Sequence, residues 1–306
     1  MKSRCTLFFF LFFLPSIICS GQIKQVERFE MEKKNTDDFF TVASVGNMGC
    51  VILRDINKPF SFKEKVDGDQ WEITALDTAL NESWKKELSF DYNFVFKGFD
   101  ISDGHIFLLF RDGEYERNDY HLMVIDFENG ETEEYTIKNE LVMELSHIAV
   151  MNDILILGGY VRYSPTVVTY RLGDDKFNVI PGFFKDRSDI IDLHTNLNGT
   201  FNVVTLEKDY QGFFIRLRTH GEDGEILFER QVNMSPEHRV LSGKSTGFVN
   251  GNLVVTGTYG AKSSYYALGL YFAIVKPKGQ KNEIKYIPFT KLDNFFNYMR
   301  PRRAQR

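Results

Sequence analysis

The chain has 306 residues, of which 43% are hydrophobic and 15% aromatic, and its formal net charge is −5. This is the composition of a globular protein with a large core, and 29 Phe and 14 Tyr against eight Pro favour strands over disorder. The first 21 residues carry +2 and residues 290–306 carry +4, so the body between them carries −11. An acidic body argues against nucleic acid as a partner, because binding phosphates requires a basic face.

Residues 1–21 have the features of a secretory signal peptide. Lys2 and Arg4 precede an apolar run from Leu7 to Leu14, and the small residues Cys19-Ser20-Gly21 follow at the position of cleavage. The run is too short for a permanent membrane anchor. We therefore expect an exported protein, periplasmic or extracellular, without a transmembrane segment after cleavage.

The cysteines allow one alternative to a soluble exported protein. Cys19 could be the lipid-bearing cysteine of a bacterial lipoprotein, but Ile18 stands where that processing site normally has a small residue. With Cys5 and Cys19 in the leader, Cys50 remains alone, so intramolecular disulfides are not expected to hold the fold. Cys50 lies in an apolar run and is predicted to be an inert core residue.

From residue 39 onward the sequence repeats one unit five times. Each unit contains four runs rich in β-branched and aromatic residues, separated by turns of Asn, Asp and Gly, which is typical of strands joined by hairpins. Asn129-Gly130, for example, predicts a type I′ hairpin turn. The first and second strands are expected at 39–45 and 49–53, 95–101 and 105–110, 145–150 and 154–157, 189–193 and 201–206, and 245–249 and 253–258. The third and fourth are expected at 71–76 and 84–90, 121–127 and 133–137, 166–172 and 177–180, 212–219 and 226–232, and 268–275 and 284–289.

Four-stranded units that recur every ~40 to 50 residues predict an all-β protein, a β-propeller of about five blades over residues 22–289. One meander cannot bury both of its faces, and radial stacking buries them against neighbouring blades. Five blades could close into a ring or form most of a larger one, and residues 22–31 could supply a closing strand. The alternative fold is a β-sandwich, which also has many short strands but does not predict a four-strand period.

The C-terminal residues 290–306 differ from the repeats. Leu292, Phe295, Phe296 and Met299 have helical spacing, which predicts a short amphipathic helix, followed by a basic tail. The tail is expected to be solvated, with attachment to an anionic surface as the alternative.

No catalytic motif, cofactor-binding loop or paired-cysteine metal spacing is recognisable, so the catalytic residues are unknown and no cofactor or metal is expected. Gly158-Gly159, where no helix follows, is predicted to be a turn. Candidate channel residues lie in the first strands of the third and fourth units: His147, His194, Asp189 and Asp192. Such imidazoles could bind a metal or move protons, and such carboxylates, together with Asp100 and Asp103, could do acid–base work. The favoured interpretation is structural, with hydrogen bonds to nearby carbonyls and turns.

Tyrosines gather around the connections between second and third strands. They are Tyr160, Tyr163, Tyr259, Tyr265 and Tyr266. Their rings could stack on a glycan or anchor a protein partner, or they could simply cover the edges of blades.

The five units and the leader resemble exported bacterial β-propeller proteins of unknown function, with repeats similar to those of the WD40 and quinoprotein (PQQ-type) propellers. The resemblance is carried by residues 75–84 (ALDTALNESW), 255–259 (VTGTY) and 292–298 (LDNFFNY). It implies a propeller fold but no activity or site residues. The favoured function is a secreted scaffold that binds a protein or glycan on one face, with peripheral association with the envelope as a further expectation. The alternatives are a polysaccharide hydrolase or lyase with carboxylates at the channel mouth, and a structural component of a cell-envelope complex.

Overall fold

The computed structural model describes residues 27–32, 40–56, 69–90, 94–174, 177–183, 188–210, 212–247, 252–276, 280–293, 295 and 297. This part of the chain forms 21 strands and one 3-10 helix. The strands make five antiparallel sheets, each built from consecutive strands. The prediction of an all-β propeller is therefore confirmed, and the sandwich alternative is wrong. The predicted leader, residues 1–21, lies outside the described residues.

The five sheets take their strands in chain order. The first contains β1 (Phe40–Ser44), β2 (Cys50–Asp55), β3 (Asp69–Leu76) and β4 (Glu82–Phe90), and the second β5 (Phe94–Ser102), β6 (His105–Asp112), β7 (Tyr120–Asp126) and β8 (Thr132–Ile137). The third contains β9 (Glu144–Met151), β10 (Ile154–Val161), β11 (Ser164–Arg171) and β12 (Asn178–Ile180). The fourth contains β13 (Asp189–Asn196), β14 (Thr200–Lys208), β15 (Phe213–His220) and β16 (Ile226–Asn233). The fifth contains β17 (His238–Val240), β18 (Lys244–Gly247), β19 (Leu253–Ala261), β20 (Ala267–Val275) and β21 (Glu283–Pro288).

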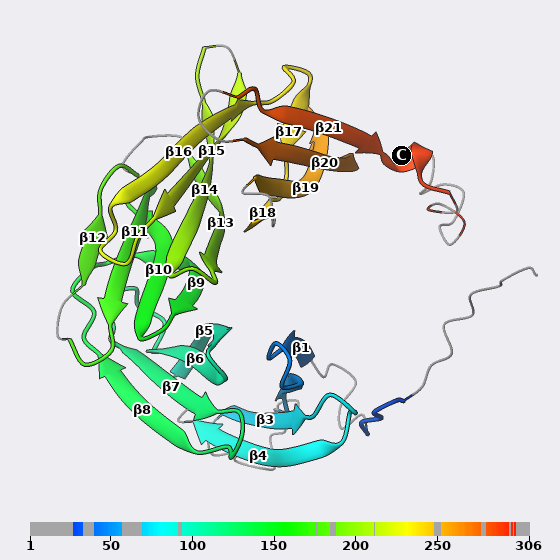
Figure 1. The fold of residues 1–306 in the computed structure, drawn as a ribbon. Helices are drawn as coiled ribbons and strands as arrows, with labels where there is room; N and C mark the ends of the chain where they lie inside the picture. The colour runs from blue at the N-terminus through cyan, green and yellow to red at the C-terminus, as the bar shows by residue number, and fades with distance from the viewer. Residues whose placement is uncertain are drawn as a thin grey trace, which may run out of the picture.

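The sheets follow one another around an arc that is open between the first and the last sheet (Figure 1). Each sheet begins at its innermost strand, and the inner strands β5, β9, β13 and β18 contact one another in sequence. Successive strands reverse direction, so the connections from second to third strands all emerge on one side of the arc. We call this side the second-loop face. The connections from first to second and from third to fourth strands emerge on the opposite face.

Hydrophobic clusters fill the spaces between neighbouring sheets. Four clusters join the first sheet to the second, the second to the third, the third to the fourth and the fourth to the fifth. Between the first two sheets, the Trp71 and Phe96 ring centroids lie 4.5 Å apart and those of Phe90 and Phe110 lie 4.2 Å apart. This is radial stacking, in which the sheets bury their apolar faces on each other. Within the described residues no such cluster joins the fifth sheet to the first.

Residues 27–32 lie on the free face of the first sheet. All of them except Glu30 line an apolar pocket of about 600 Å³ together with Phe40, Val42 and Ile52. Arg54 Nη2 donates a hydrogen bond to the Glu32 carbonyl at 2.8 Å. The predicted closing strand at 22–31 is therefore wrong in its described part, because 27–31 is irregular and packs on the first sheet. Cys50 is half-buried beside this pocket, and burial raises the pKa of its thiol.

At Gly159 and Gly257 another part of the backbone approaches too closely for a side chain. Gly158 and Gly159 lie inside β10, so the predicted turn is wrong. A Cβ atom on Gly159 would lie 2.3 Å from the Glu144 carbonyl oxygen, beside the bulge in the β9–β10 pairing. A Cβ atom on Gly257 would lie 2.0 Å from the Ser242 oxygen, where the inner strand of the fifth sheet is divided into β17 and β18. Glycine at these sites permits the irregular inner strands.

Within its described residues, the C-terminal segment contains less helix than its spacing predicts. A 3-10 helix covers Phe289–Lys291 without a side-chain cap, and the described residues that follow form turns. Phe289 and Phe295 stack with ring centroids 4.3 Å apart. Phe, Asn, Asp and Thr favour helix weakly, so an apolar spacing alone does not sustain one here.

His220, at the end of β15, is completely buried between the third and fourth sheets. Its ring stacks on Phe201, with centroids 5.1 Å apart and planes inclined by 14°. Nδ1 lies 2.9 Å from the Gly224 carbonyl oxygen, and Nε2 has no hydrogen-bond partner within the described part. Burial lowers the pKa of His220 below 6.5, although the Gly224 carbonyl acts in the opposite direction.

We expect the protein to lose stability in mild acid through His220. Because the folded state lowers its pKa, the stabilisation is complete above pH 6.5 and is lost as the pH falls below that value. The free energy of unfolding should fall by up to about 1.4 kcal/mol per pH unit. His220→Phe should flatten this slope in urea unfolding at pH 7 and pH 5.5. Some slope should remain, because burial also lowers the pKa of His147. Equal slopes in the two proteins would contradict the expectation.

Candidate functional site

Asp192, a channel candidate, links the fourth sheet to the fifth. Its side chain is 1% exposed, and Lys244 Nζ lies 3.0 Å from Oδ1. Oδ2 accepts hydrogen bonds from the Ser245 backbone N at 2.6 Å and from Ser245 Oγ at 2.7 Å. Both carboxylate oxygens are therefore engaged by β18 of the next sheet, and Asp192 stabilises the contact between inner strands.

Asp100 makes a similar link between the second and third sheets. Its Oδ2 accepts a hydrogen bond from the Val150 backbone N, in β9, at 2.7 Å. Burial raises the pKa of this carboxyl, while the hydrogen bond from Val150 opposes the rise. Two of the inner-strand carboxylates thus bind the backbone of the following sheet.

The remaining channel candidates lie on the same inner strands without forming a shared site. His147 Nδ1 lies 2.9 Å from Ser146 Oγ, and burial together with the Lys244 charge lowers the pKa of His147. His194 and Asp189 are exposed on β13. Among the described residues no group of three or more His, Cys, Asp or Glu is arranged to hold a metal ion. The polar side chains of the inner strands therefore serve mainly to join neighbouring sheets.

Two of the five candidate tyrosines are structural. Tyr160 Oη accepts a hydrogen bond from the Ile190 backbone N at 3.1 Å, which joins the third sheet to the fourth. Tyr259 is 3% exposed and lies in the core beside His238 and Tyr286. Because it is buried, Tyr259 cannot contact a binding partner.

The other candidate tyrosines are strongly exposed on the second-loop face. Tyr163 is 92% exposed, Tyr265 77% and Tyr266 79%. The structure adds two that the sequence analysis missed, Tyr115 at 70% and Tyr210 at 93%. Their positions between second and third strands could have been noticed, but their exposure could not be read from the sequence.

These tyrosines form a repeated feature of the arc. One or two occupy each described connection from second to third strand: β6–β7, β10–β11, β14–β15 and β19–β20. The corresponding connection of the first sheet lies outside the described residues. Because these connections all emerge on the same side, the exposed rings follow the second-loop face from the second sheet to the fifth.

Arginines accompany the tyrosines. The Arg239 guanidinium carbon lies 4.0 Å from the centroid of the Tyr265 ring, and that of Arg117 lies 5.7 Å from the Tyr115 ring. Arg162 precedes Tyr163 in the two-residue β10–β11 turn. Tyr and Arg are enriched at the centres of protein–protein interfaces, where few residues contribute most of the affinity.

The Arg162-Tyr163 turn is locally strained. Both residues have positive φ, 47° and 70°, as a type I′ turn requires, and at such positions Asn-Gly is the favoured pair. We expect Arg162→Asn with Tyr163→Gly to raise the free energy of unfolding by about 1 kcal/mol, because each ordinary L-residue in this conformation costs ~1 kcal/mol. Urea unfolding tests this, and a less stable variant would contradict it.

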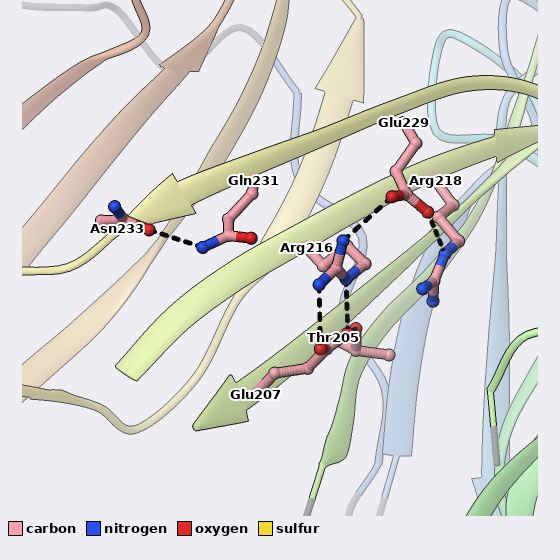
Figure 2. A network of polar contacts seen from close by, with 7 residues as sticks. All are labelled: Thr205, Glu207, Arg216, Arg218, Glu229, Gln231 and Asn233. Carbon is pink, nitrogen blue, oxygen red and sulfur yellow. Dashed lines mark hydrogen bonds and ion pairs between the residues drawn. The ribbon is translucent and has the colours of Figure 1, made fainter. Parts of the chain in front are cut away.

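A partly buried polar network occupies the fourth sheet (Figure 2). Arg216 donates to both carboxylate oxygens of Glu207, at 2.7 and 3.2 Å, and to Glu229 at 2.9 Å. Arg218 Nε donates to Glu229 at 2.6 Å, and its guanidinium carbon lies 5.0 Å from the Phe183 ring. The network therefore lies on the side turned toward the third sheet. Burial opposes the charge of Glu229, but hydrogen bonds from Arg218 and Arg216 hold its pKa below the usual value.

The opposite face carries an acidic pocket of about 910 Å³ between the second and third sheets. It includes His105, whose Nε2 lies 3.8 Å from Asp126 Oδ2, together with Glu131 and Asp153. Leu197, in the β13–β14 connection, is fully exposed on the same face. Substitutions of Leu197 and of Glu131 on this face therefore serve as controls for substitutions on the second-loop face.

Within the part of the chain that the structure describes, no helix is long and apolar enough to cross a membrane. No family model and no curated protein matches the sequence.

Among solved structures, the chain is similar to propeller-containing proteins. A prolyl endopeptidase shares 12% identity at a TM-score of 0.50, over 82% of this chain and 35% of that one. Prolyl oligopeptidase B from Galerina marginata shares 12% at 0.48, over 81% and 34%, and the Dos1 propeller 12% at 0.44, over 78% and 60%. The chain thus spans about a third of the length of these two prolyl peptidases. At this identity the first of these similarities supports the fold alone.

Proposed function

We propose that this protein is an exported propeller scaffold that binds a protein partner through the second-loop face. The observation that carries the proposal is the exposed tyrosine in each described connection from second to third strand. Exposed aromatic rings on short connections between rigid strands offer large contact area at a low cost in conformational entropy. Export rests on the predicted signal peptide.

The arginines favour a protein over a glycan as the partner. Arg239 covers one side of the Tyr265 ring, which leaves less free ring surface for stacking a sugar. A Tyr–Arg pair instead offers an apolar surface next to a charge that can pair with a carboxylate or a backbone carbonyl. The enzyme alternative has less support, because the inner-strand carboxylates Asp100 and Asp192 hold neighbouring sheets together.

The proposal predicts a partner that depends on this face. The tagged protein should be isolated from its native cells after crosslinking, and its companions compared by mass spectrometry among three variants. A partner retained by the wild type and by Leu197→Ser, on the opposite face, should be lost from Tyr265→Ser/Tyr266→Ser and from Arg162→Asn/Tyr163→Gly. Since the last variant is expected to be more stable than wild type, its loss of binding could not be attributed to unfolding. Equal recovery from all variants would contradict the proposal.

A further inference from the structure

Two connections of the second-loop face are fixed to each other at the second sheet. The backbone N of Asn139, in the β8–β9 connection, donates to Asp119 Oδ1 at 2.8 Å, and Asn139 Nδ2 donates to the Glu116 carbonyl at 2.7 Å. Beneath them Arg111, 5% exposed, donates to the carbonyls of Gly113 and Glu114 at 3.0 and 2.5 Å. The β6–β7 connection is thus held in one conformation, which lowers the entropic cost of binding.

This arrangement presents an apolar pair to solvent. Tyr115 is 70% exposed and Val142 is 56% exposed, although the two residues come from different connections. Both line a pocket of about 530 Å³, together with Glu114, Glu116 and Arg117. A second pocket of about 770 Å³ also contains Tyr115 and Arg117. An exposed aromatic and aliphatic pair that lines such a pocket can receive apolar side chains of a partner.

Carboxylates surround the pair. Residues 112–119 and 138–144 contain six: Asp112, Glu114, Glu116, Asp119, Glu140 and Glu144. All six are exposed, against the two cations Arg117 and Lys138 in the same segments. Lys97 interacts electrostatically with Glu114 and Glu116, and Arg111 lies beneath the same connection, so the six carboxylates face four cations and remain in excess. The surface around Tyr115 and Val142 therefore has a negative potential, which favours a positively charged partner.

We propose that the surface formed by Tyr115, Val142, Glu114 and Glu116 binds a cationic amphipathic segment of a partner protein. This inference rests on the proposed function and specifies the chemistry of the partner at one part of the second-loop face. Apolar side chains of the segment contact Tyr115 and Val142, and its Lys or Arg side chains pair with Glu114 and Glu116. Because these charges stand at an exposed rim, the interaction weakens as salt rises.

The test uses two synthetic peptides as probes. One is an amphipathic peptide of Leu and Lys, and the other has the same Leu positions with every Lys replaced by Glu. Fluorescence anisotropy with the mature full-length protein measures Kd for each. The cationic peptide should bind, weakening at least tenfold between about 50 and about 300 mM NaCl, and the acidic peptide should bind at least about tenfold more weakly. Equal binding of the two peptides would overturn the inference.

Variants localise the binding. Tyr115→Ala and the pair Glu114→Gln/Glu116→Gln should each raise Kd for the cationic peptide about tenfold, as for residues at an interface centre. Glu128→Gln/Glu131→Gln is the matched control, because it removes two exposed carboxylates from the opposite face of the same sheet. It should change Kd less than twofold. If the control variant raised Kd as much as Glu114→Gln/Glu116→Gln does, the binding would depend on overall acidity and the inference would be wrong.

The two proposals fail separately. If Tyr115→Ala leaves peptide binding and the native partner unchanged, while Tyr265→Ser/Tyr266→Ser removes that partner, this inference is wrong and the proposed function stands. If neither variant affects any partner, both are wrong. Saturable binding of a neutral oligosaccharide that is lost in Tyr115→Ala, without binding of the cationic peptide, would identify a glycan site and overturn the inference.

Discussion

Glu207→Gln should lower the free energy of unfolding by about 3 kcal/mol, because it leaves a largely desolvated guanidinium without its closest counter-charge. Glu207 is 3% exposed and the Arg216 side chain 18%, so water replaces the lost carboxylate only in part. Glu229 accepts from Arg216 at 2.9 Å but also holds Arg218, and one carboxylate then serves two cations. Urea unfolding at pH 7 measures the change.

An exposed ion pair shows how much of the expected loss of stability comes from burial and not from ion pairing itself. Asp153 accepts both hydrogen bonds from Arg171 Nη1 at 2.8 Å, yet the two side chains are 48% and 42% exposed. Asp153→Asn should cost about 0.5 kcal/mol or less, as is usual for exposed pairs. Replacing both partners, Glu207→Leu with Arg216→Met, should recover at least half of the loss, since apolar side chains carry no desolvation penalty. A Glu207→Gln cost as small as that of Asp153→Asn would contradict the expectation.

Asp192→Ala is the second change with a large expected effect, also about 3 kcal/mol, because it leaves buried donors without an acceptor. The Ser245 backbone N and Oγ both lose Asp192 Oδ2, and Lys244 loses its counter-charge. The loss of stability should appear as unfolding at a lower urea concentration. Hydrogen exchange should show it at Ser245 and along β18, since Asp192 joins the fourth sheet to the fifth.

Asp189 provides the control on the same strand. It is exposed at the start of β13, so Asp189→Ala should change the free energy of unfolding by about 0.5 kcal/mol or less. The comparison also tests the role of Asp192. If Asp192→Ala were as stable as Asp189→Ala, the link between inner strands would not be its main role, and an acid–base role would regain support.

The strands were predictable because their causes are local. The prediction at 105–110 corresponds to β6 (His105–Asp112), and that at 226–232 to β16 (Ile226–Asn233). Apolar alternation and the Asn, Asp and Gly turns set the strand ends, and the four-strand period set the grouping into sheets. The short strand β17 (His238–Val240) was missed, because it exists through pairing with β19 and not through a pattern of its own.

The candidate site was only partly predictable. Tyr163, Tyr265 and Tyr266 are exposed as a binding role requires, whereas Tyr259, from the same group, is 3% exposed. Nothing near Tyr259 in the sequence distinguishes it, since its burial depends on His238 and Tyr286 from other strands. Likewise, Asp189 and Asp192 belong to one strand, and only the position of the fifth sheet made one exposed and the other a link.

By itself, the sequence determined the four-stranded repeat, the strand order and the position of the turns, because hairpin pairing joins neighbours along the chain. The tertiary structure alone decided which polar and aromatic side chains are buried between sheets, and that the arc is open between its first and last sheets (Figure 1). Contacts between sheets join residues some 50 positions apart, such as Asp192 with Ser245. Such contacts depend on how the sheets are placed in space, which no local pattern of residues specifies.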